Sequence, residues 1–277
     1  MSTNLVKHTI STKDLEALKN AKANMENINL AMKGLNHLGN SIESGIQRIP
    51  AKQQQWIQEL VNKTLLLVVK ANLTTMQKGR PFKKASNATY KTLVTSSGIL
   101  GGAFGAPAFA ADLTVSTKFM MRSILDIARS EGEDIMNIDT QLACLQVFAL
   151  GGGSKDDDGM ETSYYTTRIA LSSSIKGASA YMVNTGMSNV LENILKTSAN
   201  PILKLIGMVA SRFSVQVSEK FIAQAIPVAG AIGGGSLNFV FLQHFQQMAK
   251  AHFTIRKLER KYSEAVVKEL YEKIVIN

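Results

Sequence analysis

The sequence predicts an all-α fold, a multi-helix bundle built from long amphipathic helices. Apolar residues recur at three- and four-residue spacing through most of the chain, as they do along one face of a helix. No sustained period-two alternation marks a strand, and no Asn-Gly or Asp-Gly pair joins two alternating runs into a hairpin. Two glycine-rich stretches, 93–111 and 221–249, contain no Lys, Arg, Asp or Glu. We interpret them as apolar helical hairpins within the bundle.

We expect the other helices to pack against the stretch 221–249. Gly230, Gly234 and Asn238 are four residues apart and therefore share one helical face. Small residues on one face allow a second backbone to approach closely. The stretch 93–111 repeats the glycine spacing, which suggests an internal duplication of a glycine-faced hairpin. The glycines expected to pack helices are Gly98, Gly101, Gly102, Gly105, Gly230, Gly233 and Gly234.

The N-terminal part predicts two helices of different character. Thr12 resembles an N-cap, and the weakly amphipathic helix after it is expected to pack loosely within a region spanning 1–49. The second helix should begin after Pro50 and end near Gln77, with an apolar face. We therefore expect two parts, the N-terminal region 1–49 and a helical domain 50–277.

The middle of the chain predicts a long helix, a shorter one and a loop. The long helix should open at Asp112 and end at Gly132, a residue suited to a helix C-terminus. The shorter helix, about 138–150, is apolar on most faces. Residues 151–159 read as a solvated turn, because their three consecutive Asp residues do not alternate as calcium ligands do.

The C-terminal part predicts further helices. A Ser/Thr-rich helical region extends to about residue 198, and Asn200-Pro201 should start an apolar helix. A final helix should continue from the second glycine-rich stretch to the C-terminal end. If it is unbroken, Asn238 and Arg256 share one azimuth, since eighteen residues make five turns.

Composition limits the function classes. The formal net charge of +10 implies a partner with a negative surface. Cys144 is the only cysteine and lies in an apolar run, so we expect it to pack as a small apolar residue. No apolar signal-peptide region opens the chain, which favours a cytoplasmic protein. With four histidines, no His-Glu-x-x-His and no Gly-Lys-Ser/Thr loop, we expect neither a metal nor a cofactor.

Two blocks of the sequence resemble the EcsC family, a bacterial family named after the third gene of an ABC-transporter operon. They are GILGGAFGAPAFAADLTVSTKFMMRSILDIARSEGED and IPVAGAIGGGSLNFVFLQHFQQMAKAHFTIRKLERKYSE, and the resemblance covers about 50–275. The family usually has Tyr-Gly where this chain has Glu131-Gly132 and again where it has Tyr262-Ser263. The resemblance implies a membrane-associated accessory protein without an established reaction. The family pattern falls on Gly102, Asp112, Arg122, Pro227, Gly230, Gly233, Gly234, Asn238, His252, Arg256 and Glu259.

The polar residues of this pattern are the candidates for catalysis. They border apolar stretches on helices. A structural, non-catalytic interpretation is that they form a buried network that fixes helix register. The alternative is a hydrolase or lipid-modifying enzyme, although no Gly-x-Ser-x-Gly elbow is present. The candidate set is Asp112, Arg122, Asn238, His252, Arg256 and Glu259.

The basic residues predict contact with an anionic surface. Nucleic acid is disfavoured because the chain has no recognition motif and few aromatic residues near its basic runs. We therefore expect a cytoplasmic, peripherally membrane-associated accessory protein that docks on anionic lipid or a membrane transporter, and an enzyme is less expected. The residues expected to bind the anionic surface are Lys78, Arg80, Lys83, Lys84, Lys91, Lys257, Arg260 and Lys261.

Overall fold

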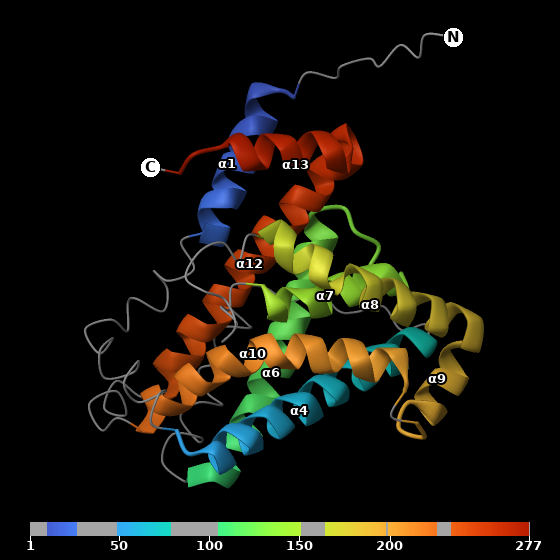
Figure 1. Cartoon of the computed structure of the whole chain (residues 1–277), viewed down its shortest axis with the longest axis vertical. Helices are drawn as coiled ribbons and strands as arrows, with labels where there is room; N and C mark the ends of the chain where they lie inside the picture. Colours follow the sequence, from blue (N-terminus) through green and yellow to red (C-terminus); the bar gives the residue numbers. More distant parts are fainter. Residues whose placement is uncertain are drawn as a thin grey trace.

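The computed structural model describes residues 10–26, 49–78, 105–150, 164–197, 199–225 and 234–276. These residues form nine α-helices and a short 3₁₀ helix and contain no strand, which confirms the all-α prediction (Figure 1). The elements are α1 (Thr12–Glu26), α4 (Ala51–Gln77), α6 (Gly105–Ser130), α7 (Ile138–Gln146), η2 (Val147–Ala149), α8 (Tyr164–Thr185), α9 (Met187–Asn193), α10 (Pro201–Ala225), α12 (Gly234–Tyr262) and α13 (Glu264–Lys273).

The short helix α7 lies inside the bundle, with α6 and α8 packed against it (Figure 1). Asn137 caps its first turn, because its side-chain oxygen accepts a hydrogen bond from the backbone N–H of Asp139 at 2.7 Å. Every residue from Thr140 to Leu150 is buried. Cys144 is one of them, and it is fully buried as a small apolar residue, as expected.

The longest helix, α12, crosses the molecule and contacts α1, α6, α10, α13 and η2. Its apolar face carries Phe241 and Phe245, whose rings lie 5.3 Å apart. Phe245 also contacts Phe148 from η2 and Phe213 from α10, with ring centroids 5.2 and 5.4 Å away. These rings join three elements in one core.

Several helix ends lie where the sequence predicts them. Helix α4 spans the predicted residues after Pro50. Asn200 caps α10, because its side-chain oxygen accepts from the N–H of Ile202 at 2.9 Å. Gly132 ends α6 with φ +85°, and the N–H groups of Gly132 and Glu133 bond to the carbonyls of Arg129 and Ala128. This is the double hydrogen bond of a Schellman motif, which favours glycine.

Three predicted helix boundaries are wrong. Helix α6 begins at Gly105 rather than Asp112, since Pro107 is tolerated in a first turn and does not interrupt it. Helix α1 is capped by Ser11 rather than Thr12, because the Ser11 hydroxyl accepts from the N–H of Asp14 at 3.2 Å. The C-terminal helix is broken at Ser263, where φ is +77°, so α12 and α13 are separate helices.

Helix α1 is firmly attached to the domain, in contrast to the loose packing expected for its region. Leu18 is fully buried against the core. The ammonium of Lys22 donates to the backbone carbonyls of Tyr271 and Ile274 at 2.9 and 2.7 Å. These carbonyls lie at the end of α13, so α1 and α13 are held together. The domain boundary at residue 49 stays a prediction.

The glycine predictions fall mostly outside the described residues. Gly98, Gly101, Gly102, Gly230 and Gly233 lie there. Gly105 starts α6 with φ +75°, and a Cβ built on it meets open space among the described atoms. Its structural role here is therefore its left-handed backbone. Gly234 is the first residue of α12.

Candidate functional site

A low-charge end of the bundle forms where α6 and α12 begin and α10 ends. We define it as residues 105–117, 213–225 and 234–243 of these helices. Its ionisable residues are Asp112, Glu219 and Lys220. Helix α4 also begins at this end (Figure 1), and Lys52 in its first turn is exposed.

Aromatic rings from three helices meet at the low-charge end. Trp56 of α4 lies 6.1 Å from Phe109 of α6 and 6.0 Å from Phe221 of α10, between ring centroids. Phe109 and Phe221 are 5.1 Å apart. Phe109 is buried, whereas Trp56 and Phe221 are only partly covered. An amphipathic indole at the edge of an apolar region is typical of a boundary between apolar and wet surroundings.

A buried ion pair lies beneath these rings. The ammonium of Lys220 donates to Asp112 Oδ2 at 2.7 Å, and Asn238 Nδ2 donates to Asp112 Oδ1 at 2.6 Å. Both charged side chains are almost completely buried. Burial lowers the pKa of Lys220, while the charge of Asp112 and its hydrogen bond oppose that effect. The Lys220 ammonium also lies 5.3 Å from the ring centroid of Phe241.

Glu219, next to Lys220, is half-buried without a hydrogen-bond or ion-pair partner among the described residues. Burial raises the pKa of this carboxyl to about 7. The low-charge end therefore holds one neutralised pair and one carboxyl that takes up a proton near neutral pH.

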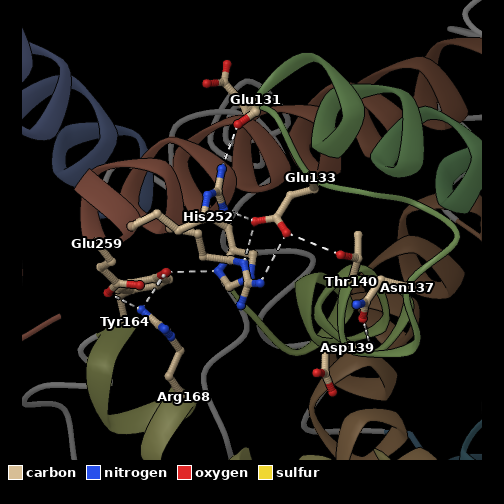
Figure 2. Close-up of polar contacts among 11 residues, drawn as sticks. Glu131, Glu133, Asn137, Asp139, Thr140, Tyr164, Arg168, His252 and Glu259 are labelled. Atoms are coloured by element: carbon tan, nitrogen blue, oxygen red, sulfur yellow. Dashed lines mark hydrogen bonds and ion pairs between the residues drawn. The ribbon is translucent and has the colours of Figure 1, made fainter. Parts of the chain in front are cut away.

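A second polar cluster surrounds His252 (Figure 2). Tyr164 OH and His252 Nδ1 are hydrogen-bonded at 2.9 Å, linking α8 to α12. The Nε2 atom of His252 is buried and has no hydrogen-bond partner among the described residues. Burial lowers the pKa of His252 well below its usual value, and the nearby guanidinium groups of Arg168 and Arg256 lower it further. His252 is therefore a neutral imidazole in the folded protein.

Glu259 joins this cluster to a tyrosine pair. Its Oε1 accepts from Arg168 Nη1 at 2.5 Å and from Tyr165 OH at 2.9 Å. Arg168 also donates to Tyr164 OH at 3.2 Å and lies over the Tyr164 and Tyr165 rings. Each ionised group is thus satisfied within the network. This arrangement resembles a register-fixing polar core more than a reactive site.

Helix α12 carries a cationic face, which we define as Lys250, Arg256, Lys257, Arg260 and Lys261. Each of these side chains forms an ion pair with a carboxylate of another element.

Glu131 and Glu133, in the turn after α6, organise the face, and Figure 2 shows Glu133 among its polar contacts. Glu131 pairs with Lys250 and, at 3.3 Å, with Lys257. Glu133 accepts from Arg256 Nε at 2.9 Å and also pairs with Arg260. Burial raises the pKa of each carboxyl, but the paired cations outweigh burial and lower both values overall.

The predicted catalytic set does not form one site. Asp112 and Asn238 belong to the low-charge end, His252 and Glu259 belong to the second cluster, and Arg256 belongs to the cationic face. Asn238 and His252 are fourteen residues apart on α12, about 21 Å along its axis. Arg122 lies half-buried on α6, ten residues beyond Asp112.

Three important residues were absent from the predictions. Lys220 could have been noticed as the last charged residue before the uncharged stretch 221–249, since a cation in apolar surroundings needs a partner. Tyr164 and Arg168 follow the predicted loop at helical spacing, but nothing in the sequence pairs them with α12.

The predicted anion-binding residues are also distributed over separate surfaces. Lys78 is exposed at the end of α4, where the neighbouring Gln77 bonds to Ser188 of α9. Lys257, Arg260 and Lys261 belong to the cationic face. The other four predicted residues, Arg80, Lys83, Lys84 and Lys91, lie outside the described residues.

Among the described residues, no group of three His, Cys, Asp or Glu side chains is placed to hold a metal ion. None of the described helices combines the length and apolar character needed to cross a bilayer.

Comparison with known proteins gives one match. Residues 12–258 match the EcsC protein family. No curated protein and no solved structure matches the chain significantly.

Proposed function

We propose a function at the membrane for this chain, which belongs to the EcsC protein family by its match over residues 12–258. It acts as an accessory protein rather than an enzyme, and the low-charge end contacts the bilayer. Its partners are an anionic membrane surface and a protein of that membrane, such as a transporter.

The observation that carries this proposal is the scarcity of charge where four helices meet. Among the described residues of α6, α10 and α12 at this end, Asp112 and Lys220 form a buried ion pair, and α4 adds the exposed Lys52 at its start. The remaining carboxyl, Glu219, has a pKa of about 7 and is readily neutralised. Moving this end into apolar surroundings costs little free energy, because the main opposing cost is the desolvation of unpaired charges.

Two further features support the proposal. Trp56 and Phe221 are partly covered aromatic residues at this end, and aromatic rings are favoured at membrane interfaces. The formal net charge of +10 favours an anionic bilayer over a neutral one. Lys52, exposed at the start of α4, would meet the headgroups.

The hydrolase alternative is not favoured by the geometry. Asp112 and His252 are both buried, and their hydrogen bonds belong to two different clusters. A general acid and base must reach one substrate, but Asp112 bonds to Asn238, which lies about 21 Å along α12 from His252.

The test uses Trp56, which is the only tryptophan of the chain. The protein is mixed with phosphatidylglycerol vesicles whose acyl chains are brominated, and tryptophan emission is recorded. We expect quenching and a blue shift, because bromine quenches only indoles that reach the acyl region. Neutral vesicles should give weaker binding in co-sedimentation.

A matched control moves the reporter to another surface. In the Trp56→Phe background, Val183→Trp places an indole on α8, where Val183 is 66% exposed. This reporter should remain unquenched. Vesicle binding without Trp56 quenching would contradict the low-charge end as the contact. A protein that stays in the supernatant with both lipids, and in the soluble fraction of cells, would contradict membrane association altogether.

A further inference from the structure

The cationic face of α12 has a regular geometry. Lys250, Lys257 and Lys261 are separated by seven and four residues, so they follow one line along the helix. Their side chains are 58%, 59% and 59% exposed. Arg256 and Arg260 lie beside this line on the flank that faces the turn after α6.

Buried carboxylates hold these cations in place. The side chains of Glu131 and Glu133 are only 6% and 7% exposed and lie beneath the cations they bind. Asp14 from α1 anchors Lys261 at 2.7 Å. Five cations thus meet three carboxylates, which leaves an excess of two positive charges on a fixed surface. Cations fixed in this way lose less side-chain freedom when an anionic partner binds.

We propose that the cationic face is a docking site for an acidic segment of a partner protein. Carboxylates of such a segment complement the excess positive charge. This choice of a protein over a lipid rests on the proposed function, in which the bilayer meets the low-charge end.

Distance separates the two surfaces. From Asn238 to Lys250 and Lys261 there are 12 and 23 residues of continuous helix, about 18 and 35 Å. The Debye length at physiological salt is about 8 Å, so headgroups at the low-charge end are screened from the cationic face. When the low-charge end meets the bilayer, the cationic face remains available to a protein.

The test measures binding of a fluorescein-labelled peptide of alternating glutamate and alanine by fluorescence anisotropy, without lipid. A glutamine–alanine peptide of the same length is the neutral control. The variant Lys250→Gln/Lys257→Gln/Lys261→Gln should bind the acidic peptide about tenfold more weakly, as three exposed charge pairs would give. The matched control removes three exposed lysines from α6, α8 and α10 and has the same net charge: Lys118→Gln/Lys176→Gln/Lys204→Gln.

The control variant should bind the acidic peptide within about twofold of the unmodified protein, because its lysines lie on other helices. Equal losses in both variants would overturn the proposal, since net charge alone would then explain binding. Unchanged affinity in the α12 variant would overturn it as well. Loss of phosphatidylglycerol vesicle binding in the α12 variant, without loss of peptide binding, would assign the face to lipid. Quenching of Trp56 is read separately, so either proposal can fail alone.

Discussion

Ser263 adopts a backbone conformation that is nearly restricted to glycine, and replacing it should stabilise the protein. Its φ and ψ are +77° and 152°, in a region that costs a non-glycine residue about 1–3 kcal/mol. Ser263→Gly removes that cost but adds about 0.5–1 kcal/mol of backbone entropy to the unfolded chain. The net gain should be about 0.5–2 kcal/mol. The side chain is exposed and caps nothing, so its loss costs little.

Gly186 supplies the matched control. It precedes α9 with φ +76° and ψ 146°, nearly the same conformation, and a Cβ added there meets no atom within 4 Å. Gly186→Ser should therefore destabilise the protein through its backbone alone, by an amount similar to the gain at Ser263. Ser263→Ala retains a Cβ and should change little.

Urea unfolding followed by circular dichroism measures all three variants at one pH. A gain of 1 kcal/mol also raises the melting temperature by about 2–4 °C for a chain of this size. If Ser263→Gly is neutral or destabilising while Gly186→Ser costs stability, the strain assigned to Ser263 is wrong. If Ser263→Ala stabilises as much as glycine, the hydroxyl rather than the backbone is responsible.

The remaining predictions concern buried ionisable groups. Lys220→Met should cost about 3–5 kcal/mol in urea unfolding, because Asp112 is left buried without its cation; adding Asp112→Leu should restore most of the loss. Near pH 5 to 5.5 the free energy of unfolding should rise with pH by about 1.4 kcal/mol per unit, since burial lowers the pKa of His244 and His252, which release nearly two protons on folding, while Glu219 takes up about one. The slope should become shallower toward pH 6.5, where each unfolded histidine holds only about half a proton. The stabilisation that the two histidines contribute is complete above their unfolded pKa of about 6.5, and it is lost as the pH falls. Glu219→Gln should about double the slope, and a slope that stays unchanged would contradict its raised pKa.

The fold was predictable because helical periodicity and capping are local. Asn200 and Pro201 mark the start of α10 within one segment of sequence, and Gly132 marks the end of α6. The break at Ser263 was not predictable by the same rule, since serine in that conformation is held by its surroundings rather than favoured by its chemistry.

The candidate site was predictable only in part, because the sequence of one helix does not show which residues of another helix it contacts. Asp112 and Asn238 were both proposed from the family pattern, and they do bond to each other. Their third member, Lys220, comes from α10. His252 was also proposed, but its partner Tyr164 lies 88 residues away in sequence, and only packing of α8 on α12 brings the two together.

The burial of α7 has a practical consequence for chemistry on this protein. Cys144 is its only thiol, lies in α7 and is fully buried, and burial raises its pKa well above the usual value. A maleimide or disulfide reagent therefore reacts with it only when the core opens. The rate of that reaction reports how often the core around α7 opens. A cysteine introduced at an exposed position can meanwhile be labelled selectively in the folded protein, with Cys144 left in place.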